Sequence, residues 1–290
     1  MKDAIRFHDF PVAGIEPMTA CTARAYPRHM HDQYGIGVID SGGHASWSGR
    51  GQVEAGPGHL ICVNPGEVHD GRAIGQRSRS WRILYFEPAL MEATRADVLE
   101  GAKASFTFEA PVFADDRVRR VFDDAFGYAA ANAQFGDGAG RDDALGGDTP
   151  SRDTPHDAIA CETAILRLVA RLGAHSTDRA ANDGGPTASI RRARERIDDD
   201  PAASLTLTQL ANEAGLSRYQ LIRGFARELG LTPHAYVLQR RIALARRLIR
   251  AGRPLADAAL AAGFCDQSHL TRCFVRQLGV TPSRYAANSA

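Results

Sequence analysis

The hydrophobic pattern divides the chain into a β-rich first part and a helical second part. Between Phe7 and Glu87, apolar residues alternate with polar or small ones in short runs, of which 34–40, 58–64 and 80–87 are the clearest, and glycine and proline turns separate the runs. A period of two is typical of half-buried strands. Short strands at this spacing predict a small all-β barrel or sandwich over residues 1–110.

Farther along, the apolar period lengthens to between three and four residues, which indicates amphipathic helices. Residues 117–134 and 158–173 each place their apolar side chains on one helical stripe. We expect a helical connector suited to dimerisation over residues 111–175. Within it, the glycine- and aspartate-rich segment 136–157 predicts a mobile surface loop, and the following segment 176–188 has the composition of a linker.

The last hundred residues contain an internal repeat, which predicts two copies of one helical unit. Residues 221–236 match residues 270–285 at nine of sixteen positions, including a shared Gly-x-Thr-Pro. Each copy has a short apolar segment, a glycine, and a second amphipathic segment that begins after Ser217 or Asp266. Serine and aspartate are favoured N-caps, and glycine is the favoured left-handed turn residue. We therefore expect an all-α tandem helix-turn-helix domain over residues 189–290.

The formal net charge of +1 conceals an asymmetry between the two parts. Residues 189–290 carry 16 arginines, no lysine and eight acidic residues, a net charge of +8, whereas residues 1–188 carry −7. A basic domain joined to an acidic one is typical of a protein that binds nucleic acid through one domain only. The segment between the two copies has five arginines that are candidates for phosphate contacts or plain solvated charge: Arg240, Arg241, Arg246, Arg247 and Arg250.

Helical geometry predicts which side chains of each second helix point outward. Leu221 and Phe225 define a buried face, so Arg223 lies opposite them, and the second copy repeats this arrangement with Arg272. An outward arginine can donate two hydrogen bonds to guanine in the major groove, and such a pair is worth about 1–3 kcal/mol of base discrimination. The outward faces therefore have the chemistry of DNA-recognition helices.

The second copy also resembles the signature of the AraC/XylS family of bacterial transcription regulators. The match runs from Ala262-Gly263-Phe264 through residues 269–274 to residues 279–285. The resemblance implies DNA-facing positions at Arg218, Tyr219, Ile222 and Arg223 in the first copy and at Gln267, Ser268, Thr271 and Arg272 in the second. Cys265 stands where a polar or acidic residue is commoner, and Ile222 is apolar where some members have a polar base-contacting residue.

Histidines of the first part belong to two short motifs, Pro-x-His-x-His at 27–31 and Pro-Gly-Glu-x-His at 65–69. His-x-His on a strand puts both imidazoles on one face, and a third histidine from a later strand can complete a facial set of metal ligands. The motifs resemble the effector-binding cupin of many AraC-type regulators, which implies that the all-β domain over residues 1–110 is a cupin-like barrel. That resemblance implies an effector bound by His29, His31, Tyr34, Glu67 and His69, with Trp47, Trp81 or Tyr85 as walls.

Two other interpretations of the histidines stay open. A cupin enzyme usually supplies a glutamate four or five residues after His31, where this chain has Gly35 and Ile36. We therefore expect no metal, no cofactor and no catalysis. His29, His31 and His69 are the weak candidates for a metal, and a metal-dependent cupin enzyme with a helical appendage is the alternative function. In the remaining interpretation, these histidines are only satisfied polar groups at the barrel rim.

Composition narrows the class of protein further. A chain of 290 residues with 44% apolar and 24% charged residues is typical of a folded two-domain protein. Its five cysteines are scattered without a C-x-x-C, and no run approaches the roughly 18 apolar residues of a membrane helix. We expect a cytoplasmic transcriptional regulator, activator or repressor, controlled by a small-molecule effector. Its expected partners are double-stranded promoter DNA, a second copy of itself and RNA polymerase, with no membrane.

Overall fold

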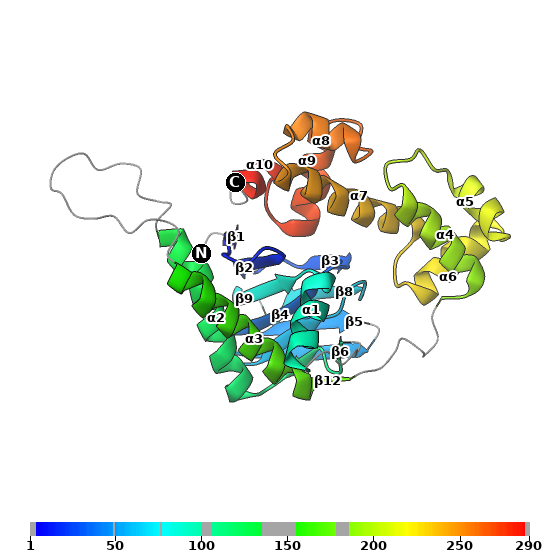
Figure 1. Ribbon diagram of the computed structural model, residues 1–290. Coiled ribbons are helices and arrows are strands. Elements are labelled where there is room, and N and C mark those ends of the chain that lie inside the picture. The colour runs from blue at the N-terminus through cyan, green and yellow to red at the C-terminus, as the bar shows by residue number, and fades with distance from the viewer. Residues whose placement is uncertain are drawn as a thin grey trace.

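The computed structural model describes residues 4–48, 50–75, 77–99, 106–134, 155–177 and 186–287. Figure 1 shows a β-rich N-terminal domain with helices on one side and a separate helical C-terminal domain. Most of the predicted mobile loop and the centre of the predicted linker lie outside the described residues, so both stay predictions. Within the described residues, no helix combines the length and the apolar character that a membrane crossing requires.

Two antiparallel sheets form the N-terminal domain. The larger sheet has the order β1-β2-β9-β4-β7-β11 and the smaller β3-β8-β5-β6. The larger sheet comprises β1 (Ala4–Phe7), β2 (Ile15–Thr22), β9 (Arg79–Phe86), β4 (Tyr34–Ser41), β7 (Leu60–Val63) and β11 (Val112–Phe113). The smaller comprises β3 (Tyr26–His29), β8 (His69–Ala73), β5 (His44–Ser48) and β6 (Gly51–Ala55). The three clearest predicted strands correspond to β4, β7 and β9.

Three helices cover the outer face of the larger sheet: α1 (Pro88–Val98), α2 (Asp116–Gln134) and α3 (Pro155–Leu172). Successive side chains of β4 point alternately toward these helices and toward the interior between the two sheets. Tyr34, Ile36 and Val38 join the core beneath the helices, whereas Gly35 and Gly37 face the interior between the sheets, against Ile83 and Tyr85 of β9. A short pair, β10 (Thr107–Phe108) with β12 (Ser176–Thr177), and the 3₁₀ turn η1 (Gly173–His175) complete the domain.

The C-terminal domain consists of two helix-turn-helix units joined by α7 (Pro233–Arg250). The first unit contains α4 (Ala188–Asp199), α5 (Leu207–Ala214) and α6 (Arg218–Glu228), and the second contains α8 (Leu255–Ala261), α9 (Gln267–Leu278) and α10 (Pro282–Ala287). The eighteen residues of α7 span about 27 Å. The predicted tandem helix-turn-helix architecture is confirmed.

Local signals explain where α5, α6 and α9 begin and end. Thr206 and Ser217 each form a capping box with the glutamine three residues later. Asp266 accepts a hydrogen bond from the backbone N–H of His269 at 2.6 Å and so caps α9. Gly215, between α5 and α6, has φ = 67°, a left-handed conformation that glycine adopts without strain.

The barrel packs against both units of the helical domain. One continuous apolar core joins Phe7 of β1 to Phe274 of α9 and Tyr285 of α10. A second core joins Met30 of the barrel to the first unit. The two domains therefore form one packed body in this arrangement.

Candidate functional site

The outward face of α6 carries the four residues predicted to face DNA in the first unit. Leu221 and Phe225 are fully buried, whereas Arg218, Tyr219, Ile222 and Arg223 are exposed, Tyr219 at 68%. The guanidinium of Arg223 lies over the Tyr219 ring, 5.6 Å from its centroid. This face presents one aromatic, one aliphatic and two cationic side chains to solvent.

The outward face of α9 repeats the arrangement in the second unit. Gln267, Ser268 and Arg272 are exposed, while Leu270 and Phe274 are fully buried. Thr271 is half-buried, and its hydroxyl donates to the Gln267 carbonyl at 2.8 Å. The C-terminal end of α9 meets the barrel, because a side chain added at Gly279 would clash with Ile5. The barrel therefore leaves the first turns of α9 open.

The arginines of α7 mostly bind protein groups instead of facing solvent. Arg241 donates to the carbonyls of Pro201 at 2.8 Å, Ala203 at 3.0 Å and Gly263 at 2.6 Å, so it joins the loop before α5 to the turn before α9. Arg240 pairs with Asp32 of the barrel and Asp198 of α4. Arg246 and Arg250 pair with Glu16. In this arrangement four of the five candidates for phosphate contact, all but Arg247, bind protein groups among the described residues, and phosphate contact stays a prediction.

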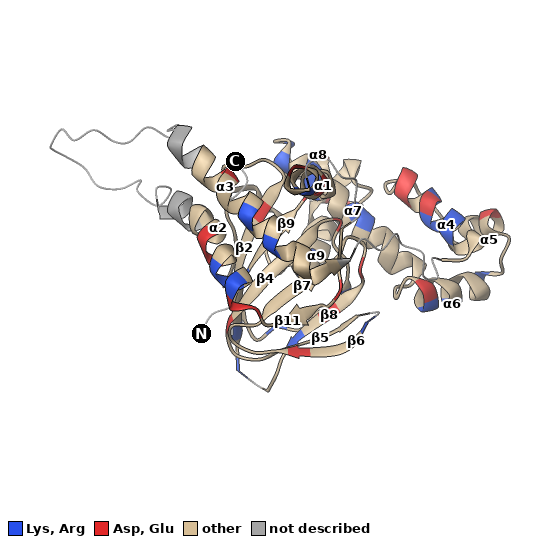
Figure 2. Cartoon of the chain, turned by 60° about the horizontal axis from the view of Figure 1, so that its bottom comes forward, with Lys and Arg blue, Asp and Glu red and all other residues tan. Residues whose placement is uncertain are grey.

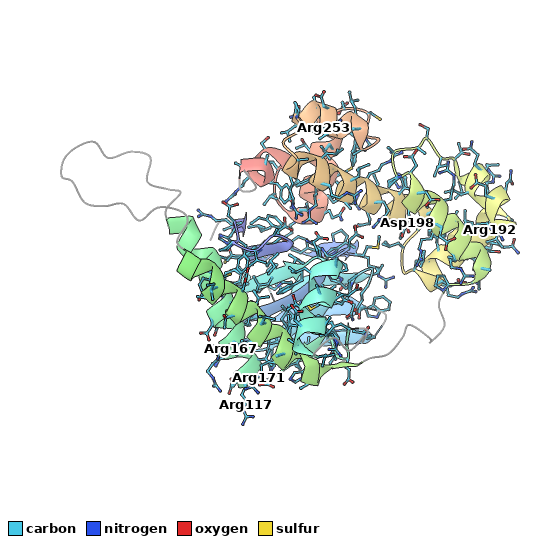
Figure 3. The ribbon with its side chains drawn as sticks, in the orientation of Figure 1. Arg117, Arg167, Arg171, Arg192, Asp198 and Arg253 are labelled. Atoms are coloured by element: carbon cyan, nitrogen blue, oxygen red, sulfur yellow. The ribbon has the colours of Figure 1, made fainter. Side chains whose placement is uncertain are left out.

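Charge alone does not locate a DNA-binding surface on this domain. Basic residues lie on several of its helices, α4, α6 and α7 among them, and further ones lie on α2 of the N-terminal domain (Figure 2). Arg117, Arg167 and Arg171 project from α2 and α3 on the side away from the helical domain (Figure 3). The repeated exposed faces of α6 and α9 identify the candidate surface more sharply than net charge does.

A cavity of about 100 Å³ lies between the two sheets of the barrel. Its wall contains the three motif histidines, His44 and the aromatic residues Tyr26, Trp81 and Tyr85. These residues come from strands of both sheets, except His31, which lies between β3 and β4. The helical domain supplies the rest of the wall through Arg246 of α7 and Gln277 and Leu278 of α9. A molecule in this cavity would therefore touch both domains.

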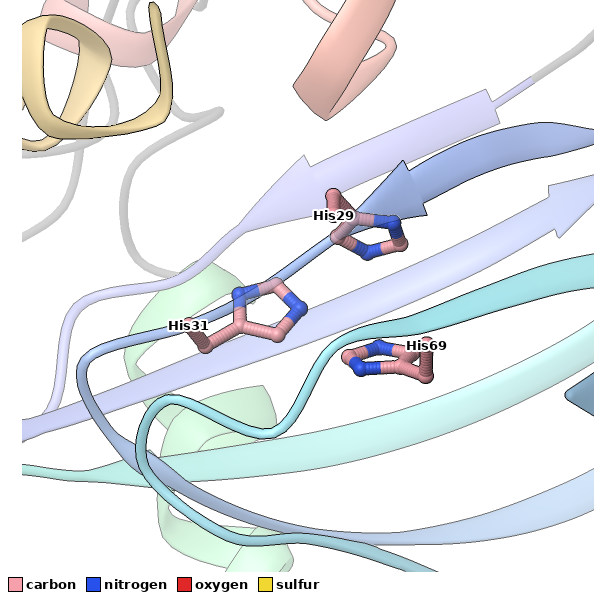
Figure 4. Close-up of side chains that lie close together, drawn as sticks. All are labelled: His29, His31 and His69. Carbon is pink, nitrogen blue, oxygen red and sulfur yellow. The ribbon is translucent and has the colours of Figure 1, made fainter. Parts of the chain in front are cut away.

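His29, His31 and His69, which all line the cavity, lie close together (Figure 4). His29 ends β3 and lies directly opposite His69, the first residue of β8, in the antiparallel register. Their ring centroids are 4.4 Å apart, and the His31 ring lies 5.0 Å from that of His29 and 5.3 Å from that of His69. One nitrogen from each ring lies within 4.8 Å of the other two.

The environment of these histidines keeps them neutral. Burial, which penalises the charged form, lowers the pKa of His29 to about 3 and that of His69 to about 4. Burial and the charges of its neighbours also lower the pKa of His31 well below 6.5. A neutral imidazole has one N–H donor and one nitrogen lone pair, so the three rings can bind a cation or hydrogen-bond to a polar ligand.

Two predicted cavity residues lie elsewhere. The Tyr34 side chain faces the helices, where its hydroxyl donates to the Phe106 carbonyl at 2.7 Å, because β4 turns every second side chain away from the interior. Trp47 is 37% exposed on β5, with Arg28 stacked 4.0 Å from its centroid. Glu67 does line the cavity, but its Oε2 accepts hydrogen bonds from both the backbone N–H and the side-chain amide of Asn64.

The cavity also has a buried arginine that sequence reasoning missed. Arg79 is fully buried and donates to His44 Nδ1 at 2.9 Å and to the Arg24 carbonyl at 3.1 Å. Its Nη2 has no hydrogen-bond partner among the described residues. A guanidinium whose hydrogen bonds go to neutral acceptors keeps its charge unbalanced, and burial lowers the pKa of Arg79 to about 10. Arginine on a strand next to tryptophan gives no distinctive pattern in a sequence.

A second missed feature is the polar contact between the domains. Glu16 of β2 is buried, pairs with Arg246 and Arg250 of α7, and accepts a hydrogen bond from the Tyr285 hydroxyl of α10. Burial would raise the pKa of Glu16, but the charges of both arginines outweigh it and lower that pKa below 4.5. The carboxylate therefore stays charged and joins the barrel to α7 and α10, which both pack against α9.

Two family models match the chain in the order of its two domains. An AraC-like ligand binding domain matches residues 12–146, and a helix-turn-helix domain matches residues 210–288. The chain belongs to the AraC family of transcriptional regulators. It is a DNA-binding regulator with a small-molecule-binding domain, as the resemblance noted in the sequence implied.

Individual relatives are also described as transcriptional regulators. YbfI of Bacillus subtilis (strain 168), an uncharacterised HTH-type transcriptional regulator, is 27% identical over 247 residues, which cover 84% of this chain and 81% of that protein. LumQ of Photobacterium leiognathi, a probable transcriptional regulator, is 37% identical over 82 residues, 28% of this chain and 33% of that protein. The second match spans only about a third of its relative.

Solved structures of ToxT from Vibrio cholerae share the two-domain fold. ToxT from strain O395 superposes with a TM-score of 0.53 at 10% identity, covering 96% of this chain and 98% of that one. Wild-type ToxT from strain SCE256 with bound unsaturated fatty acid gives 0.52 at 11% identity, covering 98% and 94%. The likeness confirms the fold, a β-rich N-terminal domain followed by a helical C-terminal region.

Proposed function

We propose that this regulator contacts promoter DNA through the outward faces of α6 and α9 and is controlled by an effector in the barrel cavity. The DNA-facing set is Arg218, Tyr219, Ile222, Arg223, Gln267, Ser268, Thr271 and Arg272. The single observation that carries the proposal is the shared cavity wall, in which Arg246, Gln277 and Leu278 come from the helices of the DNA-binding domain. A ligand that favours one arrangement of this wall shifts the population of DNA-binding conformations.

The two recognition faces support sequence-specific binding. Each has an exposed arginine on the first turns of a capped helix, which is the part of a recognition helix that contacts base edges. Arg241 joins the two units through backbone carbonyls and so holds α6 and α9 at one spacing. Because the distance between α6 and α9 is fixed, the protein favours a duplex with two contacted segments at the matching separation over a duplex with a single contacted segment.

The cavity supports an effector with hydrogen-bond acceptors. Arg79 brings a buried guanidinium with an unpartnered Nη2, and His29, His31 and His69 supply three further polar groups. Trp81 and Tyr85 supply apolar walls. This lining suits a small ligand with at least one oxygen-rich group, because an oxygen acceptor can take the hydrogen bond that Arg79 Nη2 does not make to the described residues.

An exposed apolar stripe supports a homodimer. On α3, Ile159 is 63% exposed and Leu166 is 39% exposed, and their spacing of seven residues puts both on one side of the helix. Apolar side chains at this spacing on an outer helix favour packing against a second helix. We therefore propose that α3 pairs with α3 of a second copy.

The remaining expectations follow from this role. A protein that regulates promoters acts beside RNA polymerase in the bacterial cytoplasm, so we propose both the location and the partner. We propose no catalytic activity, and the regulatory relatives support that proposal. The alternative of a metal-dependent cupin enzyme gives no role to the paired recognition faces.

Selection from a random duplex library tests the proposal. The full-length chain should enrich one sequence, and its affinity should fall steeply as salt increases, because bound arginines release counterions from phosphates. The affinity should also change when a ligand that raises the melting temperature in a screen of carboxylic acids, amino acids and sugars is added. No enriched sequence, or an affinity insensitive to salt, would contradict the DNA assignment.

A further inference from the structure

The hydrogen bonds of two cavity histidines determine which ring nitrogen carries the proton. His29 Nδ1 lies 2.8 Å from the Pro27 carbonyl, and His69 Nδ1 lies 3.0 Å from the Glu67 carbonyl. A carbonyl only accepts, so each Nδ1 must carry the hydrogen. In a neutral ring this leaves the Nε2 lone pair as an acceptor. Both histidines use the same local device, a bond to the carbonyl two residues earlier.

Histidines that bind metals usually donate one ring N–H to a nearby acceptor in the same way. A backbone carbonyl that accepts from one ring nitrogen orients the imidazole and makes the other nitrogen a better ligand. The antiparallel register adds to this, because it places His29 and His69 opposite each other. Three ring nitrogens within 4.8 Å of one another then need only small side-chain rotations to reach one ion.

A carboxylate ligand from β4 would be crowded by the side chains of β9. A Cβ at Gly35 would lie 3.2 Å from Ile83 Cδ1 and 3.3 Å from Tyr85 Cε1. The Tyr85 ring instead lies 4.9 Å from the His31 ring. The side chains present therefore form a set of three imidazoles, and the remaining directions open to the cavity.

We infer that His29, His31 and His69 bind one divalent transition-metal ion of the zinc class, with the remaining coordination positions directed into the effector cavity. This reverses the expectation from the sequence, which rested on the absent glutamate. Imidazole nitrogens suit zinc, copper, iron and nickel, and three protein ligands leave a position for an exogenous ligand. The inference rests on the proposed function in one respect, namely that this cavity is the effector site.

The charges around the histidines are compatible with a cation. The positive charge of Arg246 lies close enough to His31 to disfavour a second positive charge there. Glu16 balances the charge of Arg246 in a direct ion pair. Asp70 and Glu67 bring two carboxylates to the cavity wall, and Arg79 brings one guanidinium. A ligand with an oxygen-rich group could bridge the ion and Arg79. It would fill an open coordination position of the ion and accept a hydrogen bond from the guanidinium.

Metal analysis of the full-length protein tests the inference directly. Protein stripped with a chelator and dialysed against Zn²⁺ should retain one zinc per chain. X-ray absorption at the zinc edge should show imidazole nitrogens at about 2.0–2.1 Å. This measurement uses the wild-type chain, so it does not depend on any variant folding. Zinc below one equivalent, or a coordination shell containing sulfur, would overturn the inference.

Variants identify the ligands. His69→Ala and His31→Ala should each weaken zinc binding by more than about 100-fold, since even the groups that orient a ligand contribute 10–100-fold. His234→Ala removes an exposed histidine at the start of α7 and should retain wild-type zinc affinity. Zinc should raise the melting temperature of the wild type and of His234→Ala only. Retention of tight zinc by His69→Ala would overturn the assignment.

A separate DNA-binding assay distinguishes this inference from the proposed function. Selection of a specific duplex by a chain that never retains zinc would overturn the metal site and leave the regulator assignment standing. Stoichiometric zinc on the three histidines, in a chain that selects no duplex, would support the metal site and contradict the DNA assignment.

Discussion

The hydroxyl of Tyr285, in the last helix, donates a 2.7 Å hydrogen bond to Oε1 of Glu16, in the second strand. The same carboxylate pairs with Arg246 and Arg250 of α7, so three groups of the DNA-binding domain meet one group of the barrel. Arg246 also forms part of the cavity wall. This polar contact between the domains therefore lies directly beside the proposed effector cavity.

Glu16→Gln should loosen the domain interface. Removing one partner of a buried ion pair leaves charge uncompensated and costs about 3–5 kcal/mol. We expect this loss in urea unfolding, together with faster proteolysis between the domains. Asp40→Asn is the matched control, because Asp40 pairs with Arg82 in a half-exposed position, where an ion pair contributes at most about 1 kcal/mol. Equal losses in the two variants would contradict the special role of Glu16.

The same contact should weaken in acid. The pKa of Glu16 is below its usual 4.5 in the folded protein, because Arg246 and Arg250 outweigh the effect of burial. A carboxyl with a lowered folded-state pKa contributes stability above pH 4.5 and loses that contribution as the pH falls through the folded value. Burial raises the pKa of Tyr285, so its hydroxyl stays protonated throughout. Unfolding free energies from pH 7 to pH 3 should therefore fall less in Glu16→Gln than in the wild type.

Local signals explain why the helical domain could be predicted in detail. Ser217 and Asp266 cap their helices as the residue types indicated, and Gly215 ends its helix in the left-handed region. The spacing of apolar residues within each helix indicates its buried face, and this spacing can be read without the rest of the chain. The exposed recognition faces were therefore predictable once the repeat was recognised.

Contacts between distant segments explain what could not be predicted. Glu16 and Arg246 are 230 residues apart, and no local pattern marks either as a partner of the other. For the same reason, the protein partners of the α7 arginines could not be predicted from the sequence. Tyr34 was misplaced because the segment between β3 and β4 interrupts the alternation, so the orientation of β4 side chains cannot be counted from the histidines.

Arg223→Ala and Arg272→Ala should each reduce affinity for the selected duplex by about 1–3 kcal/mol and relax base preference at one position. Both side chains are exposed, so the folded state should be unaffected. Arg117→Ala removes the same charge from α2, on the side away from the helical domain, and should leave affinity unchanged. Binding measured across salt concentrations, with single-base variants of the duplex, checks both effects. Wild-type base preference in both variants would show that the recognition faces are wrongly assigned.

Leu166→Asp should convert the protein from a dimer to a monomer. Leu166 and Ile159 expose apolar surface on one side of α3, and a carboxylate in such a contact would have to lose its hydration. Leu260→Asp is the matched control, since Leu260 is 61% exposed on α8, away from α3. Sedimentation equilibrium should give the monomer mass for Leu166→Asp and the dimer mass for Leu260→Asp. A dimer with unchanged dissociation constant in Leu166→Asp would place the interface elsewhere, and a monomeric wild type would remove the role proposed for α3.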